Sequence, residues 1–476
     1  MMDYERCIMM LVDGARYDVY ARLLEGGELP NSKAIFADKG GFREATTVMP
    51  SVSGPAHLPM LTGCYPGRCN IPGIRWFDRQ RYAKSVWQRG RYRSYMGLNK
   101  VNRMTREVSP DVPSAWELFP DGGGMFAWFN RGMSRSGDLT RGSKIYQSVK
   151  SYVTGKWESG DAFIQGKLIE AAQSDRRFLY AVLPTVDELG HKLGPLDESC
   201  IEAYRNFDRF LPRLMDALGD SAEKTFIGVT SDHGQSTTHT HFDLQAFVGA
   251  HVKKLMSFPF AWRRMFDCDA VSMVSGNGLA HLSFKGAEGW EERPDVTQAG
   301  SAAWAIIEGL IQEEAIQALV YRDDGRICIH SEKGRAHLWR DAEGLHYQAQ
   351  NGDPLGLPAL PECMSDDDAL ALTFASDHPD ALVQLEQLFW SERCGDVVVM
   401  SETGFDLRTH WEYQDHKGTH GGTWWEHMKV PLLCNHPLPD APLRNVDIFP
   451  TAMAACGKEV TAVMDGRNLL MSPPAS

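Results

Sequence analysis

Short motifs at four places in the chain combine aspartate and histidine in a way that suits metal binding. Each motif follows an apolar run or lies in a turn that contains glycine; the residues are Asp13 in VDG, Asp187 and His191 in DELGH, Asp232 and His233 in SDHG, and His420 in GTHGG. This mixture of carboxylate oxygens and imidazole nitrogens suits Zn²⁺, with Mn²⁺ as the second choice. A catalytic Zn²⁺ takes about three protein ligands and keeps one position open. Six ligands therefore predict two ions.

Each motif is a weak signal when it is taken alone. A DHG turn is more often structural, and an Asp-x-x-x-His pair lies more often on the surface of a helix. Their joint occurrence at the ends of apolar runs, together with a candidate nucleophile, favours a catalytic metal centre.

The candidate nucleophile lies in the segment 46–63, which reads TTVMPSVSGPAHLPMLTG. An apolar helical pattern begins after Gly54, and Pro55 suits the first position of a helix. Ser53 is therefore expected just before a helix N-terminus, where unpaired N–H groups stabilise the charge that develops during attack on phosphorus. The simpler alternative is a serine that only caps the helix. The candidate metal-binding motifs elsewhere in the chain favour the interpretation of Ser53 as a nucleophile over that of a simple helix cap.

Apolar runs that indicate buried strands come directly before three of the motifs. They are residues 7–12 (CIMMLV), 177–184 (RFLYAVLP) and 225–230 (TFIGVT). Helices are expected near Asn31–Asp38, Asp161–Ala172, Glu198–Leu218 and Ala302–Gln312, and further strands at Met125–Asn130 and Asp396–Ser401. This alternation predicts an α/β fold whose central sheet is mainly parallel and flanked by helices. Because ligands gather at the carboxyl ends of such strands, the motifs should meet there.

The composition is that of a globular protein with an acidic balance. The chain has 476 residues, of which 43% are hydrophobic and 23% charged, and its formal net charge is −13. A general nucleic-acid-binding protein would carry a basic footprint instead. No apolar run reaches the ~18–20 residues of a membrane span, and the N-terminal segment lacks the features of a signal peptide. The ten cysteines show no framework spacing, so we expect reduced thiols and a cytoplasmic protein.

Two segments fall outside this core pattern. Residues 258–384 are less regular, and we expect them to form an inserted, smaller cap subdomain between core segments 1–257 and 385–476. Residues 75–106 are rich in arginine and lysine with interleaved aromatic residues. This second segment is either a solvated excursion or one wall of a pocket for an anionic substrate, with Arg79 and Arg91 as candidate contacts.

The order of these residues along the chain resembles that of the alkaline phosphatase superfamily. Within it, the sequence is most similar to the type I phosphodiesterase/nucleotide pyrophosphatase branch, whose nucleophile stands nine residues before a Thr-Gly pair and two before a proline. Ser53, Pro55 and Thr62-Gly63 fit this spacing. The segments DIFPTAMAACG and MDGRNLL also resemble the ending of the family. The resemblance covers residues 7–73, 178–235 and 397–469.

The resemblance implies an alkaline phosphatase-like core that holds two Zn²⁺ ions, with Mn²⁺ possible. One ion would be bound by Asp187, His191 and His420, and the other by Asp13, Asp232, His233 and Ser53. Gly54 and His57 are expected beside the phosphoryl group of the substrate. Two positions depart from the family pattern: the branch usually has Thr where this chain has Ser53, and Asn where it has Ala56. Without that amide, the oxyanion is left to the Gly54 N–H and the metal ions.

The leading hypothesis is a two-metal hydrolase that cleaves phosphodiester or pyrophosphate bonds of a small anionic substrate through a phosphoseryl intermediate on Ser53. A phosphomonoesterase, a phosphonate hydrolase and a phosphoryl transferase on the same core are the alternatives. A non-catalytic, metal-stabilised binding protein is a remote alternative, because a degenerate site should have lost some of its ligands. A diester carries one net negative charge, so a site without an extra Arg or Asn favours a diester over a monoester.

Overall fold

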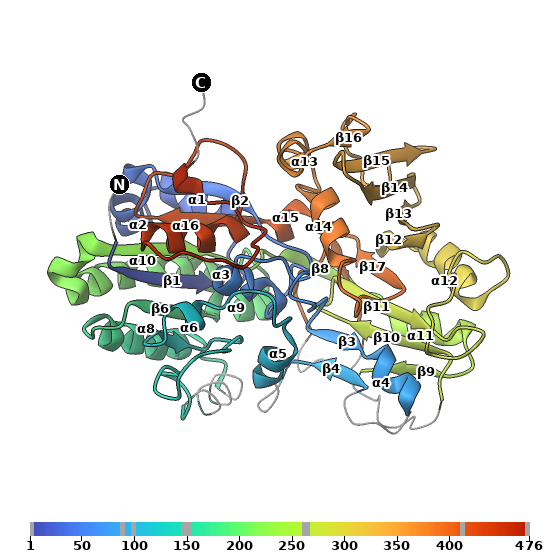
Figure 1. The fold of residues 1–476 in the computed structure, drawn as a ribbon, viewed down its shortest axis with the longest axis horizontal. Helices are drawn as coiled ribbons and strands as arrows, with labels where there is room; N and C mark the ends of the chain where they lie inside the picture. The colour runs from blue at the N-terminus through green and yellow to red at the C-terminus, as the bar shows by residue number, and fades with distance from the viewer. Residues whose placement is uncertain are drawn as a thin grey trace.

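The computed structural model describes residues 4–85, 91–96, 101–143, 146, 150, 154–258, 267–409 and 415–471. Two large β-sheets lie next to each other, each with helices packed on its faces (Figure 1). No helix in these ranges is long and apolar enough to cross a membrane.

The first sheet has seven strands, and most of its pairings are parallel. Its order is β21 (Leu443–Arg444), β2 (Phe42–Thr46), β20 (Lys429–Cys434), β7 (Thr225–Thr230), β1 (Arg6–Val12), β6 (Phe178–Leu183) and β5 (Gly123–Met125). The run β7, β1, β6 and β5 is parallel throughout, as is the pair of β21 and β2. Only β20 runs antiparallel to its two neighbours. The expected α/β fold with a mainly parallel central sheet is confirmed.

Both faces of this sheet are covered, which explains why its strands are apolar throughout rather than alternating. Successive side chains of β1 point to opposite faces: Cys7, Met9 and Leu11 pack into one core cluster, whereas Ile8 and Met10 pack into another. The Ile8 side is covered by α1 (Tyr17–Glu25), α2 (Pro30–Ile35), α8 (Glu158–Ala172), α9 (Thr185–Leu193) and α10 (Glu198–Leu218). The other side is covered by α3 (Pro59–Thr62), α5 (Val101–Glu107), α6 (Ala115–Leu118) and α16 (Ile448–Ala455).

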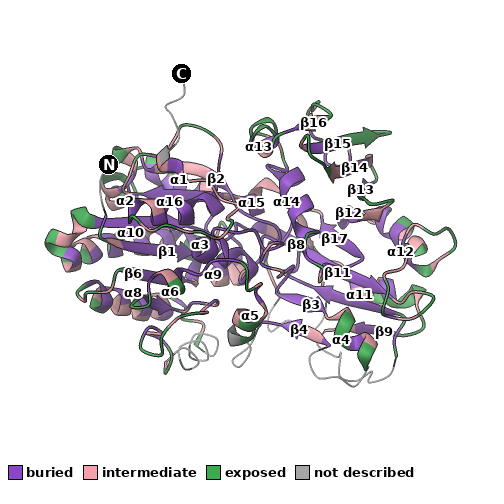
Figure 2. Ribbon diagram, in the orientation of Figure 1, coloured by how far each residue is buried: buried purple, intermediate pink, exposed green. Residues whose placement is uncertain are grey.

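The second sheet has nine strands and is almost entirely antiparallel. Its order is β16 (Cys363–Met364), β15 (Leu345–Gln350), β14 (Gly334–Arg340), β13 (Arg326–Ser331), β12 (Ile316–Asp323), β17 (Val397–Ser401), β11 (Leu279–Phe284), β10 (Ala270–Val274) and β9 (Leu255–Ser257). Its strands group residues 255–401, so β17 belongs here and not to the parallel sheet. Figure 2 shows its central strands buried, whereas the second half of β15 is exposed.

Helices also pack on both faces of the second sheet. One face carries α11 (Leu244–His251) and α12 (Ala302–Ile311), and the other carries α13 (Asp366–Thr373) and α14 (Ala381–Leu388). The cluster around α14 also takes in Val48, Met49 and Ala56, which come from the segment that carries the candidate nucleophile. Apolar packing therefore fixes this segment between the two sheets.

Smaller elements connect the two sheets. A three-stranded sheet is formed by β18 (Gly404–Asp406), β8 (Ser236–His241) and β19 (Gly418–Thr419), and a two-stranded one by β3 (Arg75–Phe77) and β4 (Tyr92–Ser94). Two further short helices are α4 (Arg79–Lys84) and α15 (Trp425–Met428). Figure 1 shows β8 between the two large sheets. Because β19 pairs with β8, a segment near the C-terminus is brought to the edge of the parallel sheet.

Two expected elements are shorter than the sequence indicated. The strand expected over Met125–Asn130 ends at Met125, because Phe126 adopts a left-handed conformation with φ of 58°. The helix expected from Pro55 is a 3₁₀ turn, η2 (Pro55–His57), followed by the single turn of α3. Pro59 begins α3 and has no N–H to donate, so it interrupts a continuous helix.

Candidate metal centre and nucleophile

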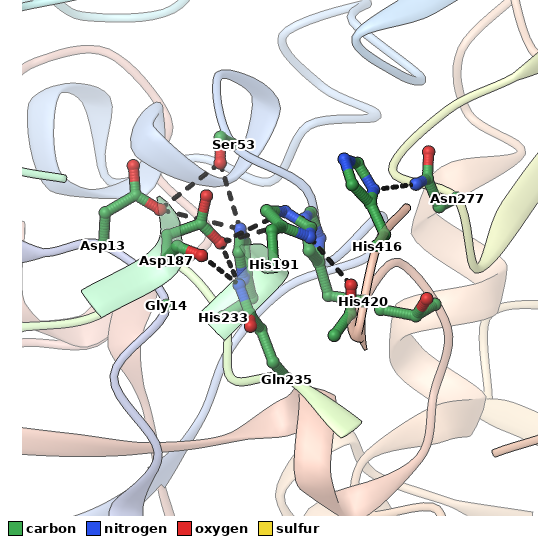
Figure 3. A network of polar contacts seen from close by, with 12 residues as sticks. Asp13, Gly14, Ser53, Asp187, His191, His233, Gln235, Asn277, His416 and His420 are labelled. Atoms are coloured by element: carbon green, nitrogen blue, oxygen red, sulfur yellow. Dashed lines mark hydrogen bonds and ion pairs between the residues drawn. The ribbon is translucent and has the colours of Figure 1, made fainter. Parts of the chain in front are cut away.

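The carboxyl ends of three adjacent parallel strands bring the acidic residues together. Strand β1 lies between β7 and β6, and Asp13 directly follows β1. Asp232 comes two residues after β7, and Asp187 lies in the first turn of α9, which follows β6. All three aspartates are buried. The expectation that the motifs meet at this edge is correct, and Figure 3 shows Asp13 and Asp187 within the resulting cluster.

The histidines reach the same place from three different elements. His191 lies four residues after Asp187 on α9, so both side chains project from one face of that helix. His233 follows Asp232 in the turn after β7, and His420 follows β19. The rings of His233 and His420 stack with 3.7 Å between their centroids.

Main-chain carbonyls orient all three imidazoles in the same manner. Nδ1 lies 2.7 Å from the Gly418 carbonyl in His191, 3.1 Å from the Gly234 carbonyl in His233, and 2.8 Å from the Ser51 carbonyl in His420. A carbonyl only accepts hydrogen bonds, so each Nδ1 must carry the proton. In the neutral rings, each Nε2 then presents a lone pair to the cluster, as a metal ligand requires.

The close approach of these nitrogens fits the presence of cations. Nε2 of His420 lies 3.2 Å from Nε2 of His191, and two lone pairs at this distance repel unless a cation or proton lies between them. Ligand atoms converge in two groups, Asp187 with His233 and His420, and Asp13 with His57 and Asp232, and within each group they lie within 4.8 Å of one another. These nitrogen and oxygen donors suit Zn²⁺ or Mn²⁺.

The charge at the site supports the same conclusion. Within the described ranges, no lysine or arginine forms an ion pair with Asp13, Asp187 or Asp232. Burial raises the pKa of Asp13, and the negative charges of Asp232 and Asp187 raise it further. Divalent ions would remove this excess of negative charge, so the residues present fit a metal centre.

The hydroxyl of Ser53 points into the cluster and does not cap a helix. Ser53 Oγ donates to Asp13 Oδ1 at 3.3 Å and lies 3.1 Å from His233 Nε2. The first residue ahead of η2 is Gly54, and no side chain caps this 3₁₀ turn. Among the described residues, no hydrogen bond uses the Gly54 N–H. The Ser53 hydroxyl and an available main-chain donor therefore lie side by side.

His57 lies behind the carboxylates and is fully buried. Its Nε2 is 3.1 Å from Asp232 Oδ2 and 3.7 Å from Asp13 Oδ2, and its ring packs on Trp128. Burial lowers the pKa of His57, but its contacts with Asp13 and Asp232 outweigh burial and raise it to about 9. Protonated His57 therefore donates to Asp232 and offers no lone pair, which leaves Asp13 and Asp232 as the candidate metal ligands of that group.

Comparison with known proteins agrees with this arrangement. A family model described as type I phosphodiesterase / nucleotide pyrophosphatase matches residues 7–423. The chain belongs to this family. The resemblance of its motifs to this branch of the alkaline phosphatase superfamily is therefore confirmed. No curated protein matches the chain.

Solved structures share the fold of this type I phosphodiesterase family member. Phosphonoacetate hydrolase from Sinorhizobium meliloti 1021, in complexes with phosphonoformate and phosphonoacetate, is 17% identical and superimposes with a TM-score of 0.56 over 96% of each chain. Human ectonucleotide pyrophosphatase / phosphodiesterase 5 is 13% identical, with a TM-score of 0.55 over 97% of each chain. At these identities the likeness establishes the fold, and it extends over nearly the whole chain.

Both arginines that were expected beside the substrate lie in the described part of the chain. The guanidinium of Arg79, on α4, bonds to Asp396 and to the carbonyls of Phe284 and Glu292. Arg91 is buried next to β4, and its carbonyl accepts from the N–H of Asp78. Within segment 75–106, residues 86–90 and 97–100 lie outside the described residues. A role in substrate binding stays a prediction for both arginines.

Two residues near the cluster were not singled out by sequence reasoning. Gln235 donates to both the carbonyl and a carboxylate oxygen of Asp187. The His416 ring stacks on His191 with 4.5 Å between centroids, and its Nδ1 contacts the Asn277 amide (Figure 3). Gln235 directly follows the SDHG motif, and His416 lies in the same DHKGTHGG segment as His420. Proximity to the motifs was the only signal available for either residue.

Proposed function

We propose that this member of the type I phosphodiesterase family is a two-metal hydrolase that cleaves phosphodiester or pyrophosphate bonds through a phosphoseryl intermediate on Ser53. The observation that carries the proposal is the placement of Ser53 Oγ, 3.3 Å from Asp13 Oδ1 and 3.1 Å from His233 Nε2. A serine hydroxyl in direct contact with two candidate metal ligands is placed for activation as a nucleophile.

The ligands divide into two sets in this proposal. As the family resemblance implies, Asp187, His191 and His420 would hold one ion, and Asp13, Asp232, His233 and Ser53 the other; the contacts within each set support this division. His233 stands between the sets, because its Nε2 is 3.3 Å from Asp232 while its ring stacks on His420. When bound, the ions would supply Lewis-acid stabilisation of the phosphoryl oxygens and lower the pKa of the serine hydroxyl.

The residues of the chain perform the remaining steps. Asp13 Oδ1 accepts the hydrogen bond of the Ser53 hydroxyl and orients its oxygen for in-line attack on phosphorus. The bond from phosphorus to the leaving oxygen breaks as the bond from Ser53 Oγ to phosphorus forms. The Gly54 N–H is placed to donate to the oxyanion. Attack by water on the phosphoserine then releases phosphate monoester and restores the hydroxyl.

We also propose how the rest of the chain is organised around this site. The second sheet and its helices would form the inserted cap expected for residues 258–384, with β9 and β17 extending it to residues 255–401. The core would then be residues 1–254 and 402–476, and it would supply the ligands. Segment 75–106 would line the approach, since β3 and β4 lie beside the second sheet (Figure 1).

A hydrolysis panel tests the proposal. Zn²⁺- and Mn²⁺-loaded protein is compared on bis-p-nitrophenyl phosphate, thymidine-5′-p-nitrophenyl phosphate, p-nitrophenyl phosphate, phosphonoacetate and p-nitrophenyl sulfate. We expect the highest kcat/KM on a diester, with chelator-treated protein as the inactive control. A preference for p-nitrophenyl phosphate would identify a phosphomonoesterase, and a preference for phosphonoacetate a phosphonate hydrolase, in place of the proposed phosphodiesterase. Hydrolysis that is unaffected by chelation would exclude the two-metal mechanism.

A further inference from the structure

A second group of metal-ligand residues lies at the far edge of the second sheet, away from the centre described above (Figure 1). Asp341 and Glu343 lie in the tight turn between β14 and β15, His346 is on β15, and Cys363 is on the edge strand β16. His346 and Cys363 are direct cross-strand partners. Ligand atoms of Glu343, His346 and Cys363 all lie within 4.8 Å of one another.

The side chain of His346 lies between the β14–β15 turn and the edge strand. The residue is 9% exposed, and its Nε2 is buried. Nε2 contacts Asp341 Oδ1 at 2.9 Å. The same oxygen also accepts from the Glu343 N–H at 2.8 Å. The His346 nitrogen and the Asp341 carboxylate are thus placed as two ligands that could share one cation.

The charge around Cys363 points the same way. Of the ten cysteines, all of which are described, nine are buried and only Cys363 is half-buried. Burial raises the pKa of the Cys363 thiol, and the carboxylates of Asp341, Glu343 and Glu362 raise it further. Among the described residues, no lysine or arginine pairs with these three carboxylates. The surroundings are therefore anionic and lack a permanent cation.

A neighbouring group of three potential ligands, in which the histidine has hydrogen-bond partners for both ring nitrogens, provides a comparison. Asp323, Cys328 and His337 also converge. There, His337 Nε2 is hydrogen-bonded to Asp323 Oδ2 at 3.0 Å, and its Nδ1 contacts the Gln350 amide at 3.3 Å. Cys328 is completely buried. Both nitrogens of this histidine are paired within the protein, so no ion is needed to explain the geometry.

We propose that Glu343, His346 and Cys363, with Asp341 as the fourth ligand, bind a Zn²⁺ ion that ties the β14–β15 turn to strand β16. One sulfur, one nitrogen and two oxygens form a donor set that Zn²⁺ accepts in closed, tetrahedral sites. Binding would displace the thiol proton of Cys363 to solvent. The ion would anchor a two-residue strand that pairs only with β15 and leads directly into α13. No ligand of the catalytic centre is shared, so this site is independent of the proposed function.

Cobalt substitution separates the two kinds of site. The proposed catalytic ligands include no thiol, so a thiolate-to-Co²⁺ charge-transfer band in reduced, Co²⁺-loaded protein reports only on a cysteine site. We expect this band in the wild-type chain, its loss in Cys363→Ser, and its retention in the matched control Cys328→Ser. His346→Gln should weaken the Co²⁺ binding that produces the band by about tenfold or more. Hydrolytic kcat should be unchanged in all three variants.

The proposal is overturned if the wild-type protein shows no charge-transfer band or if the band survives Cys363→Ser. Loss of the band in Cys328→Ser alone would assign the thiolate to the neighbouring group instead. If Cys363→Ser does not fold, the Co²⁺ titration of His346→Gln tests the proposal, because this variant keeps the thiol and removes only the imidazole nitrogen. An unchanged Co²⁺ titration in that variant would exclude His346 as a ligand.

Discussion

At the scale of single residues, the chemistry of the site depends on which ring nitrogen carries the proton. The carbonyls of Gly418, Gly234 and Ser51 each hold an Nδ1–H, which leaves the Nε2 lone pairs of His191, His233 and His420 facing inward. The same logic applies to the carboxylates. Gln235 holds Asp187 by two hydrogen bonds, so the protein itself sets the orientation of this candidate ligand.

Replacing Ser53 by alanine should remove most turnover and keep the fold. The substitution deletes the hydroxyl that contacts Asp13 and His233, so kcat should fall about 10³-fold or more, whereas metal content is retained. Ser53→Thr, which restores a hydroxyl, should recover part of the rate. Ser272→Ala is the matched control, because Ser272 is a buried serine of β10 whose hydroxyl has no partner among the described residues. Wild-type turnover in Ser53→Ala would place the nucleophile elsewhere.

Gln235→Leu should weaken metal binding without unfolding the chain. The leucine fills a similar volume but leaves the Asp187 carboxylate without the amide that orients it, and such losses cost about 10–100-fold in metal affinity. Competition with a chromophoric chelator measures the change. The control is Gln317→Leu, since Gln317 is a buried glutamine in β12 whose amide has no partner within the described ranges. Equal affinities in the two variants would mean that Gln235 does not position the ligand.

At the scale of elements, the site depends on a close contact between the end of β1 and helix α9. Gly14 has a φ of +76°, and a Cβ at this position would lie 2.7 Å from the Cα of Asp187. Its N–H also bonds to Asp232 Oδ1 at 3.2 Å. One glycine therefore lets three strand ends approach closely enough for their aspartates to share a centre.

Gly14→Ala should destabilise the protein more than the same change at Gly27. Gly27 has a similar φ of +74° but has nothing within 4 Å of an added Cβ. Gly27→Ala should therefore show only the cost of the left-handed conformation, about 1–2 kcal/mol. Gly14→Ala adds the clash with α9, a further ~1–3 kcal/mol, and should also lower metal affinity. Denaturant unfolding compares the two variants. Equal losses of stability would show that α9 shifts to accommodate the added methyl group without a further loss in the free energy of unfolding.

At the scale of the whole molecule, buried histidines join the parts of the fold. His281, on β11, donates from Nε2 to the Pro72 carbonyl at 2.9 Å and accepts from the Gly395 N–H at 3.3 Å. It thereby links the second sheet to the segment that follows the candidate nucleophile. Burial lowers the pKa of His281 to about 4, and it does the same for His378.

The free energy of unfolding should fall as the pH is lowered from about 6.5 to about 4. In this range the unfolded chain takes up a proton on His281 that the folded chain excludes, so stability is complete above pH 6.5 and is lost toward pH 4. One such group contributes a slope of about 1.4 kcal/mol per pH unit. His281→Gln should make the slope shallower by about this amount, whereas His251→Gln, at an exposed position, should not. Parallel curves for wild type and His281→Gln would contradict the assignment.

The sequence by itself determined the family, the ends of three strands and the candidate ligand residues, because each of these is a local pattern. An apolar run that ends in Asp13, or is followed by the pair Asp232 and His233, predicts a buried strand with polar residues at its end from about ten residues of sequence. Ser53 was proposed as the nucleophile in the same way, from its position ahead of Pro55 and its distance to the Thr-Gly pair. Local spacing also predicted α10 over Glu198–Leu218 and β7 over Thr225–Thr230, as the structure has them.

Only the tertiary structure decided which partner each side chain meets, because those contacts join segments far apart in the chain. The proton on His191 is held by a carbonyl 227 residues away. The guanidinium of Arg79 is bound to Asp396, 317 residues away, and not to the candidate metal ligands. His57 contacts the buried acids for the same reason. The sheet order that places β17 in the second sheet also depends on such long-range pairing. No local pattern encodes these contacts, since they form only when both sheets are packed.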